Sequence, residues 1–350
     1  MTMGRRIRVL VVDDSAFMRK AISGMLQSDP EISVAATANN GQEAVQKVLE
    51  LSPDVVTMDV EMPGMSGIEA LRTIMAVRPT PVLMLSSVTT EGARVTLDAL
   101  SLGAVDFVPK NLVDMSVEIM RVKDELIGKV KAVAGKKVRQ DRPVQRKCHA
   151  MSELFVRKQS GRTSLIAIGA STGGPKALEE MLPMLPGNVP VPILLVQHMP
   201  PTFLPPFAER LDKSCRLEVR IAGNGDILKP GRVFLAPGGT HMKLKRLHNI
   251  DIGISLESEP SDLLHRPSVD VMMGSAEEFF PGRCLGVILT GMGCDGKEGM
   301  RKIKKGGGRT LAQDEATSVV YGMPKAVAEE GLADKTAPID EMAGEILNLI

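Results

Sequence analysis

Aromatic residues, closely spaced cysteines and long apolar runs are all scarce in this 350-residue chain, which contains no tryptophan and a single tyrosine. The four cysteines, at positions 148, 215, 284 and 294, show no C-x-x-C spacing, which argues against zinc and for free thiols in a reducing compartment. No apolar run approaches the roughly 18 residues that span a bilayer. The run behind the basic N-terminus stops at Asp13 and Asp14, which argues against a signal peptide. We therefore expect a soluble, cytoplasmic protein.

The charged residues are unevenly distributed, although the net charge is only +1. Residues 121–162 contain 13 Lys or Arg against 4 Asp or Glu. A basic stretch can indicate nucleic-acid binding, but Phe155 is the only aromatic residue there that could stack on a base. We interpret the stretch as a solvated linker and expect no nucleic-acid partner.

Short apolar segments alternate with helical patterns in both halves of the chain, and the length suggests two domains. In the first half the expected strands are 7–12, 32–37, 54–58, 81–85 and 105–108, with helices near 17–27, 41–50, 66–77 and 91–101. This alternation predicts a five-stranded, parallel, doubly wound sheet of the flavodoxin type. A last helix, with apolar residues from Met115 to Val133, leads into the linker.

The second half predicts another doubly wound α/β domain, with a Rossmann-like, mostly parallel sheet. One expected parallel strand begins at Leu165, and the others are 191–197, 285–289 and 310–313. Helices are expected at 175–185, 203–212 and 296–304, and two more close the chain. Segments 232–236, 242–247 and 252–256 follow one another closely, which predicts antiparallel strands at one edge. The expected domains are 1–125 and 163–350, joined by a linker, 126–162, whose start overlaps the last helix of the first domain.

Three reactive side chains of the second half each come just after an apolar strand. Ser171 lies in a G-x-S-x-G turn before a helix, His198 follows 193–197, and Asp295 follows the strand at 285–289. The carboxyl ends of parallel strands open onto one edge, so a serine, a base and an acid could meet there. A helix N-terminus at the serine would favour a developing oxyanion.

Each of these side chains also has a simpler interpretation. The glycine-rich turn around Ser171 could hold a phosphate, and Asp295 could cap the helix at 296–304. His241 is the second candidate for the base, and His265 also remains, whereas His149 lies in the linker and His248 at an expected hairpin tip. At the level of the whole domain, a binding module without turnover and a nucleotide-binding domain stay open, although G-x-G-x-x-G is absent.

Polar side chains of the first half also gather at the carboxyl ends of expected strands. Asp13 and Asp14 end the first strand, Asp59 the third and Ser86 the fourth, and Lys110 follows the fifth. Clustered carboxylates need a hard cation, and oxygen ligands of this kind suit Mg²⁺. The lysine would add a positive charge for phosphate oxygens.

The segments Val11-Val-Asp13-Asp14-Ser, Met58-Asp59-Val-Glu-Met-Pro-Gly and Phe107-Val-Pro-Lys110 resemble response-regulator receiver domains over about 120 residues. The resemblance implies that Asp59 accepts a phosphoryl group and that Asp13, Asp14 and Asp59 hold Mg²⁺. It further implies that Ser86 and Lys110 contact the phosphoryl group and that the ring of Phe107 responds to it. Receivers usually have proline after the lysine, whereas Asn111 stands there in this chain.

The order Ser, His, Asp differs from that of α/β-hydrolases. The motifs Gly-Ala-Ser-Thr-Gly-Gly, Gln-His-Met-Pro, Ala-Pro-Gly-Gly-Thr-His, Arg266-Pro-Ser-Val-Asp270, Leu-Thr-Gly-Met-Gly-x-Asp-Gly, Gln313-Asp-Glu-Ala-Thr and Tyr321-Gly-Met-Pro resemble chemotaxis protein-glutamate methylesterases, the CheB family. The resemblance implies Ser171 as nucleophile, His198 as base and Asp295 as the group that orients it. Thr172 would support the histidine, and the backbone at Met292 would help to stabilise the oxyanion. Cys294 is interpreted as incidental.

Together the two resemblances imply a phosphorylation-activated serine hydrolase. Its substrates would be glutamate methyl esters, and also glutamines, on methyl-accepting chemoreceptors, for sensory adaptation in chemotaxis. A chemotaxis histidine kinase would supply the phosphoryl group, and the catalytic domain would need no cofactor. The family leans towards monomers, and no membrane insertion is expected.

Overall fold

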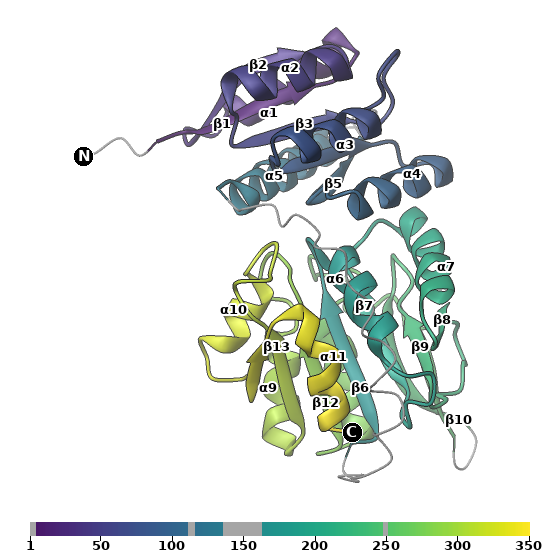
Figure 1. Cartoon of the computed structure of the whole chain (residues 1–350). Helices are drawn as coiled ribbons and strands as arrows, with labels where there is room; N and C mark the ends of the chain where they lie inside the picture. Colours follow the sequence, from purple (N-terminus) through teal and green to yellow (C-terminus); the bar gives the residue numbers. More distant parts are fainter. Residues whose placement is uncertain (1–4, 111–115, 136–162, 248–250) are drawn as a thin grey trace. The chain divides into compact units, whose positions relative to one another are not determined.

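The computed structural model describes residues 5–110, 116–135, 163–247 and 251–350. The chain divides into two compact units, Met1–Pro143 and Val144–Ile350, which are described separately (Figure 1). The domain boundaries expected from the sequence stay a prediction, because most of the expected linker lies outside the described residues. No helix within the described ranges is long and apolar enough to cross a membrane.

The N-terminal unit is a five-stranded parallel sheet in the order β2-β1-β3-β4-β5, as predicted. Its strands are β1 Ile7–Val12, β2 Ile32–Ala38, β3 Val55–Asp59, β4 Val82–Ser86 and β5 Asp106–Pro109. Its helices are α1 Ala16–Gln27, α2 Gly41–Leu51, α3 Gly67–Val77, α4 Thr90–Ser101 and α5 Ser116–Val133. Every residue of β3 and β4 is buried, as expected for central parallel strands.

Polar caps fix where the helices of this unit begin. Ser15, Asn40, Ser66 and Thr89 each accept a hydrogen bond from a backbone N–H in the first turn of the helix that follows. Ser66 and Glu69 form a reciprocal capping box at α3. Because each helix starts a few residues after a strand ends, the caps also set the length of the loops that carry the polar residues.

The C-terminal unit contains a seven-stranded parallel sheet in the order β14-β13-β12-β6-β7-β9-β8. Its strands are β6 Leu165–Ala170, β7 Ile193–Gln197, β8 Glu218–Ile221, β9 Arg232–Leu235, β12 Cys284–Ile288, β13 Arg309–Gln313 and β14 Lys335–Ala337. Its helices are α6 Gly174–Met181, α7 Leu204–Ser214, α8 Val269–Phe279, α9 Lys297–Gly306, α10 Met323–Ala328 and α11 Ile339–Asn348, with short 3₁₀ turns at Leu182–Met184 and Pro201–Phe203. The doubly wound fold class is confirmed.

The antiparallel strands of this unit are arranged differently from the prediction in one respect. β10 His241–Leu247 and β11 Asp251–Glu257 pair as an antiparallel two-stranded sheet of their own. The segment expected as a third antiparallel strand is β9, which pairs in parallel with both β7 and β8. The connection from β8 to β9 is long enough to return the chain to the same end of the sheet, and part of it bonds to β11 through Leu228 N and Ile252 O. Close spacing in the sequence cannot distinguish such a return from a hairpin.

Three elements were not predicted: β8, β14 and the helix α8. Ser268 caps α8 by accepting from Val271 N, and Met272, Met273 and Ala276 of α8 are buried. Leu165 and Ala167 of β6 belong to the same hydrophobic cluster as residues of α8, α9 and α10. Alternate residues of β6 therefore face this helix layer. The start of α8 lies close to the carboxyl end of β6, because a Cβ on Gly169 would lie 2.4 Å from a methyl carbon of Val269.

Candidate functional site

The strands that carry Ser171, His198 and Asp295 are neighbours in the sheet. β6 pairs with β7 on one side and with β12 on the other, and each of the three residues comes after the carboxyl end of its strand. Backbone hydrogen bonds join these ends, because His198 N donates to Ala170 O at 3.0 Å and Ser171 N donates to Thr290 O at 3.0 Å. The structure thus brings the three predicted residues to one edge.

The imidazole of His198 and the carboxylate of Asp295 form a direct contact. His198 Nε2 lies 2.9 Å from Asp295 Oδ2, with the side chains 8% and 12% exposed respectively. The other ring nitrogen, Nδ1, is buried and has no hydrogen-bond partner within the described residues. The carboxylate can only accept, so Nε2 carries the hydrogen and Nδ1 is left as the ring's basic atom.

The carboxylate of Asp295 is also anchored to the N-terminus of α8. Oδ1 accepts from Ser268 Oγ at 2.9 Å and from Asp270 N at 3.0 Å, and Oδ2 accepts from Val269 N at 2.8 Å. Burial opposes ionisation, but the bond and charge of His198 and the two backbone N–H groups outweigh it and hold the pKa of Asp295 well below its usual range. Asp295 is therefore an anion held in a fixed position beside the histidine ring, and its role in orienting that ring stays a prediction.

Asp295 does not cap α9, the helix that follows it, which was the alternative interpretation of this residue. The N-cap position of α9 is Gly296, and the side chain that bonds into its first turn is Asp270, whose Oδ1 accepts from Gly299 N at 2.7 Å. Asp295 thus caps α8, and Asp270, from α8, caps α9. Burial, despite the Gly299 bond and with the added charge of Asp295, raises the pKa of Asp270 to about 6.

Ser171 stands in a tight turn that depends on glycine at position 173. Gly173 has a φ of +76°, in the left-handed region, and Gly174 N donates to Ser171 O at 2.7 Å. Gly291 passes so close that a Cβ on it would lie 2.8 Å from the Cβ of Ser171. The loop after β12 is therefore held directly against the serine.

Thr172 and Met292 are the residues that follow Ser171 and Gly291 in the chain. Thr172 is buried, and its carbonyl accepts from Thr290 Oγ1 at 2.9 Å. Met292 is 40% exposed, and its backbone N–H donates no hydrogen bond to any described residue. Cys294 is exposed beside them. A free N–H beside a serine is available to an oxyanion, and the supporting roles of Thr172 and Met292 stay predictions.

The other histidines differ clearly in their surroundings. His241 is fully buried; its Nε2 lies 2.9 Å from Pro260 O, and its Nδ1 accepts from Ser268 N at 3.2 Å. Both of its nitrogens are therefore bonded to backbone, which leaves none to serve as a base. His265 stacks on His198, with the ring centroids 4.0 Å apart. His149 and His248 lie outside the described residues.

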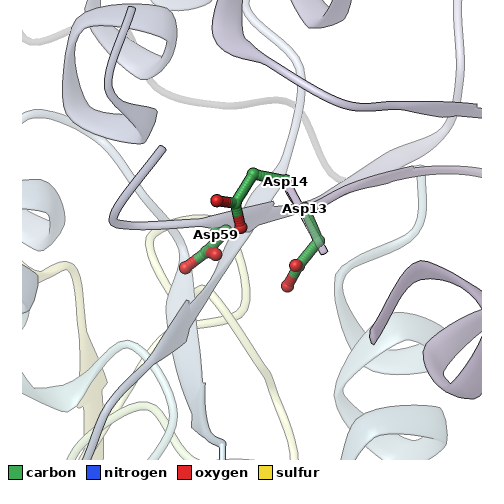
Figure 2. Close-up of side chains that lie close together, drawn as sticks. All are labelled: Asp13, Asp14 and Asp59. Carbon is green, nitrogen blue, oxygen red and sulfur yellow. The ribbon is translucent and has the colours of Figure 1, made fainter. Parts of the chain in front are cut away.

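The carboxylates predicted for the N-terminal unit converge as well (Figure 2). Asp13, Asp14 and Asp59 each offer an oxygen atom, and these atoms all lie within 4.8 Å of one another. Asp13 and Asp59 are buried and Asp14 is exposed at the mouth of a cleft that Asp59 and Lys110 also line. Lys110 Nζ lies 2.9 Å from Asp13 Oδ2 and 2.5 Å from Asp59 Oδ2.

The chemistry of this cluster fits a hard divalent cation. Asp13 Oδ2 is buried and, apart from the charge of Lys110, has no hydrogen-bond partner in the described chain. Burial, reinforced by the charge of Asp13 and opposed by Lys110, raises the pKa of Asp59. Negative charge that one lysine does not fully compensate is what an oxygen-coordinated cation such as Mg²⁺ would neutralise.

Ser86 lies on β4, next to the strand that carries Asp59, and Phe107 lies on β5, one strand further out. Ser86 is fully buried, and its Oγ lies 2.6 Å from Thr96 Oγ1 of α4. Phe107 is 4% exposed, and Lys129 Nζ of α5 donates to its carbonyl at 2.6 Å and lies 5.4 Å from its ring centroid. Asn111, the departure from the receiver pattern, lies outside the described residues.

The sequence reasoning missed the residues that hold Asp295 in place. Ser268 and the first N–H groups of α8 bind its carboxylate, yet α8 was not predicted. A signal was present, since a serine precedes a segment with buried Val269, Met272, Met273 and Ala276 at helical spacing. Prolines at both ends of the segment, Pro267 and Pro281, obscured it.

Comparison with known proteins gives consistent matches for both units. The CheB methylesterase family model matches residues 166–346, and the response regulator receiver domain model matches residues 9–119. A protein-glutamate methylesterase/protein-glutamine glutaminase of Nitratidesulfovibrio vulgaris is 46% identical over 98% of this chain and 99% of its own. One from Geobacter sulfurreducens is 46% identical over 99% and 98%.

Among solved structures, the CheB methylesterase catalytic domain of Thermotoga maritima is similar to the C-terminal unit. It is 41% identical, with a TM-score of 0.52, and the match covers 54% of this chain and 99% of that domain.

Proposed function

Because this chain belongs to the CheB methylesterase family and carries a receiver domain, we propose that it is a protein-glutamate methylesterase and protein-glutamine glutaminase activated by phosphorylation. Its substrates are side chains on the cytoplasmic part of methyl-accepting chemoreceptors, and their hydrolysis serves sensory adaptation in chemotaxis. Residues 1–125 form the receiver, 126–162 the linker and 163–350 the catalytic domain. The 2.9 Å pair of His198 and Asp295, beside the turn of Ser171, carries the proposal.

The first half of the reaction forms an ester between substrate and enzyme. Ser171 Oγ attacks the γ-carbonyl carbon of the glutamyl methyl ester while His198 Nδ1 takes the hydroxyl proton. The resulting oxyanion is positioned to accept from the N–H of Met292. The tetrahedral intermediate then breaks its bond to methoxide, which receives the proton from Nδ1 and leaves as methanol.

The second half restores the enzyme. His198 Nδ1 takes a proton from water, the hydroxide attacks the acyl carbon, and the bond to Ser171 Oγ breaks as the proton returns to the serine. The product is a glutamate side chain. A glutamine follows the same path with ammonia as the leaving group, since its amide carbonyl also passes through a tetrahedral oxyanion. Throughout, Asp295 stabilises the protonated imidazole, and the catalytic domain uses no cofactor.

The receiver domain supplies the control. Asp59 accepts a phosphoryl group from a chemotaxis histidine kinase, and Lys110 and Ser86 contact its oxygens. Asp13, Asp14 and Asp59 would hold Mg²⁺, which would neutralise charge on the phosphoryl group. The ring of Phe107 responds to the modified aspartate. A shift of about 1.4 kcal/mol in the equilibrium between restrained and active enzyme changes the active fraction up to about tenfold.

The test is methanol release from a methylated chemoreceptor fragment, with and without a small-molecule phosphodonor and Mg²⁺. We expect release that rises with the phosphodonor and is abolished in Ser171→Ala, a variant that should fold normally. Release without stimulation would keep the esterase and refute the control by Asp59. No release from the cognate receptor, together with no labelling of Ser171 by a serine-directed phosphonate, would favour a binding module instead.

A further inference from the structure

Thr290 is a buried residue in the loop after β12. Its backbone N–H, its carbonyl and its hydroxyl all form hydrogen bonds. It is 1% exposed. Its N–H donates to Gln313 Oε1 at 2.7 Å, and its carbonyl accepts from Ser171 N at 3.0 Å. Its hydroxyl accepts from Val320 N at 3.0 Å and lies 2.9 Å from Thr172 O and 3.2 Å from Val320 O. Thr290 thus joins three segments of the chain, namely the nucleophile turn, its own loop and the segment that begins at Val320, and it also bonds to Gln313.

Two of these segments carry groups that the proposed reaction uses. Through its carbonyl and hydroxyl, Thr290 binds the backbone on both sides of the nucleophile turn, at Ser171 and Thr172. Two residues further along its own loop is the backbone N–H of Met292. The bonds of Thr290 therefore set the distance between the serine and this donor.

The third segment, Val320–Met323, forms hydrogen bonds with Gly291, the residue between Thr290 and Met292. Gly291 N donates to Val320 O at 3.0 Å, and Gly291 O accepts from Gly322 N at 3.1 Å and from Met323 N at 2.8 Å. A Cβ on Gly322 would lie 2.7 Å from Gly291 O and 3.2 Å from the Cα of Met292. The loop is held from both sides, and no side chain could be added at Gly322 without moving it.

An oxyanion donor acts only when it lies about 2.7–3.1 Å from the place where the charge develops. A shift of a few tenths of an ångström at Met292 would therefore weaken stabilisation of the transition state more than binding of the substrate. We propose that Thr290 is a positioning residue that locks the oxyanion loop to the nucleophile turn. The proposal rests on the proposed function, in which Ser171 attacks and Met292 N–H stabilises the oxyanion. Thr290 is buried and bonded to the protein itself, so it does not touch the substrate.

The direct test is Thr290→Val, which keeps the shape and removes the hydroxyl. We expect kcat for methanol release to fall by about 10- to 100-fold, below the 10²–10³-fold cost of losing a whole oxyanion donor, with little change in KM. Thr290→Ser keeps the hydroxyl and should restore most of the lost kcat. Thr290→Val with the wild-type kcat would overturn the proposal.

A matched control separates positioning from stability. Thr310, in β13, is also fully buried; its Oγ1 donates to Leu332 O at 2.7 Å and accepts from Asp334 N at 3.0 Å. It lies near the amino end of its strand, away from the catalytic edge. Thr310→Val should lower the melting temperature about as much as Thr290→Val does, with kcat unchanged. Equal losses of kcat in the two variants would show that Thr290 acts only through stability.

Two further measurements keep the outcome decisive. If Thr290→Val does not fold, Gly322→Ala provides a second variant, because it displaces the same loop from its other side. It should also lower kcat with KM preserved. A folded Gly322→Ala enzyme with wild-type kcat would then refute the proposal.

The rate of Ser171 labelling by a serine-directed phosphonate should fall in parallel with kcat. If the wild type is labelled but releases no methanol, the substrate assignment fails and the labelling rates alone decide the role of Thr290. If it is neither labelled nor active, both proposals fall together.

Discussion

Asp295 meets its partners with both carboxylate oxygens as acceptors, and His198 Nε2 lies 2.9 Å from Oδ2. Oδ2 also accepts from Val269 N, and Oδ1 accepts from Asp270 N. An asparagine has one accepting oxygen and one donating nitrogen, so in either orientation its NH₂ group would face a backbone N–H. The site therefore requires a carboxylate at this position.

Asp295→Asn should consequently lose both activity and stability. We expect kcat to fall by about 10⁴-fold, because the imidazole loses the anion that sets its tautomer and stabilises its charge. The unpaired donors should lower the free energy of unfolding by about 1–3 kcal/mol. Methanol release and thermal unfolding measure the two effects, and a variant with near-normal kcat would contradict the role given to Asp295.

Asp59→Asn should give an enzyme that no longer responds to a phosphodonor, because the amide cannot accept the phosphoryl group. The matched control is Asp106→Asn, since Asp106 is a similarly buried aspartate, 4% exposed, that pairs with Lys129 at 2.9 Å in the same unit. We expect the control to lose stability and keep its stimulation. Removal of Mg²⁺ with a chelator should abolish stimulation of the wild type and leave basal methanol release intact. Stimulation of Asp59→Asn would refute the assignment of the phosphoacceptor.

Gly67→Ala should destabilise the N-terminal unit, because a Cβ on Gly67 would overlap the carbonyl oxygen of Asp59. Backbone cannot yield as a flexible side chain does, so we expect a loss of about 1–3 kcal/mol or more, and weaker phosphorylation. Gly24, in α1, has no atom within 4 Å of an added Cβ. Gly24→Ala should therefore stabilise the helix by about 0.5–1 kcal/mol. Denaturant titration of both variants would show the difference, and equal stabilities would be unexpected.

Asp270 should make the stability of the C-terminal unit depend on pH. Its pKa is raised from 3.8 to about 6, so between these values the folded protein binds a proton that the unfolded chain releases. Wild-type stability should therefore fall, relative to Asp270→Asn, as pH rises from about 4 to about 6, and the difference should level off above that range. In Asp270→Asn the oxygen of the side-chain amide still accepts from Gly299 N. Calorimetry over this pH range tests it, with the exposed Asp262→Asn as control; parallel curves for Asp270→Asn and the wild type would contradict it.

Most of the fold was predictable because its signals are local. The strands β1 to β5 lie within a residue of their expected positions, since apolar runs, capping residues and glycines all occur inside short windows. Ser171, His198 and Asp295 could be placed at one edge because parallel strands open onto the same side of a sheet.

What could not be predicted depends on contacts between distant segments. The anchor of Asp295 comes from the start of α8, and the exclusion of His241 as base depends on bonds to Pro260 and Ser268. The central position of Thr290 is invisible in the sequence, where it is one polar residue in a glycine-rich loop. Which nitrogen of His198 is basic follows only from the ring's orientation. None of these contacts produces a periodic pattern in the amino-acid sequence.

The crossed caps of α8 and α9 have a consequence for how the enzyme fails. Asp270 holds the first turn of α9, and Asp295 holds the first turn of α8, so fraying of either helix removes a bond on which the other depends. Opening of this pair would also release the carboxylate from His198. Local opening generally requires less free energy than global unfolding. Heat inactivation can thus precede the loss of the sheet, and hydrolytic activity becomes a sensitive reporter of the earliest opening event in this unit.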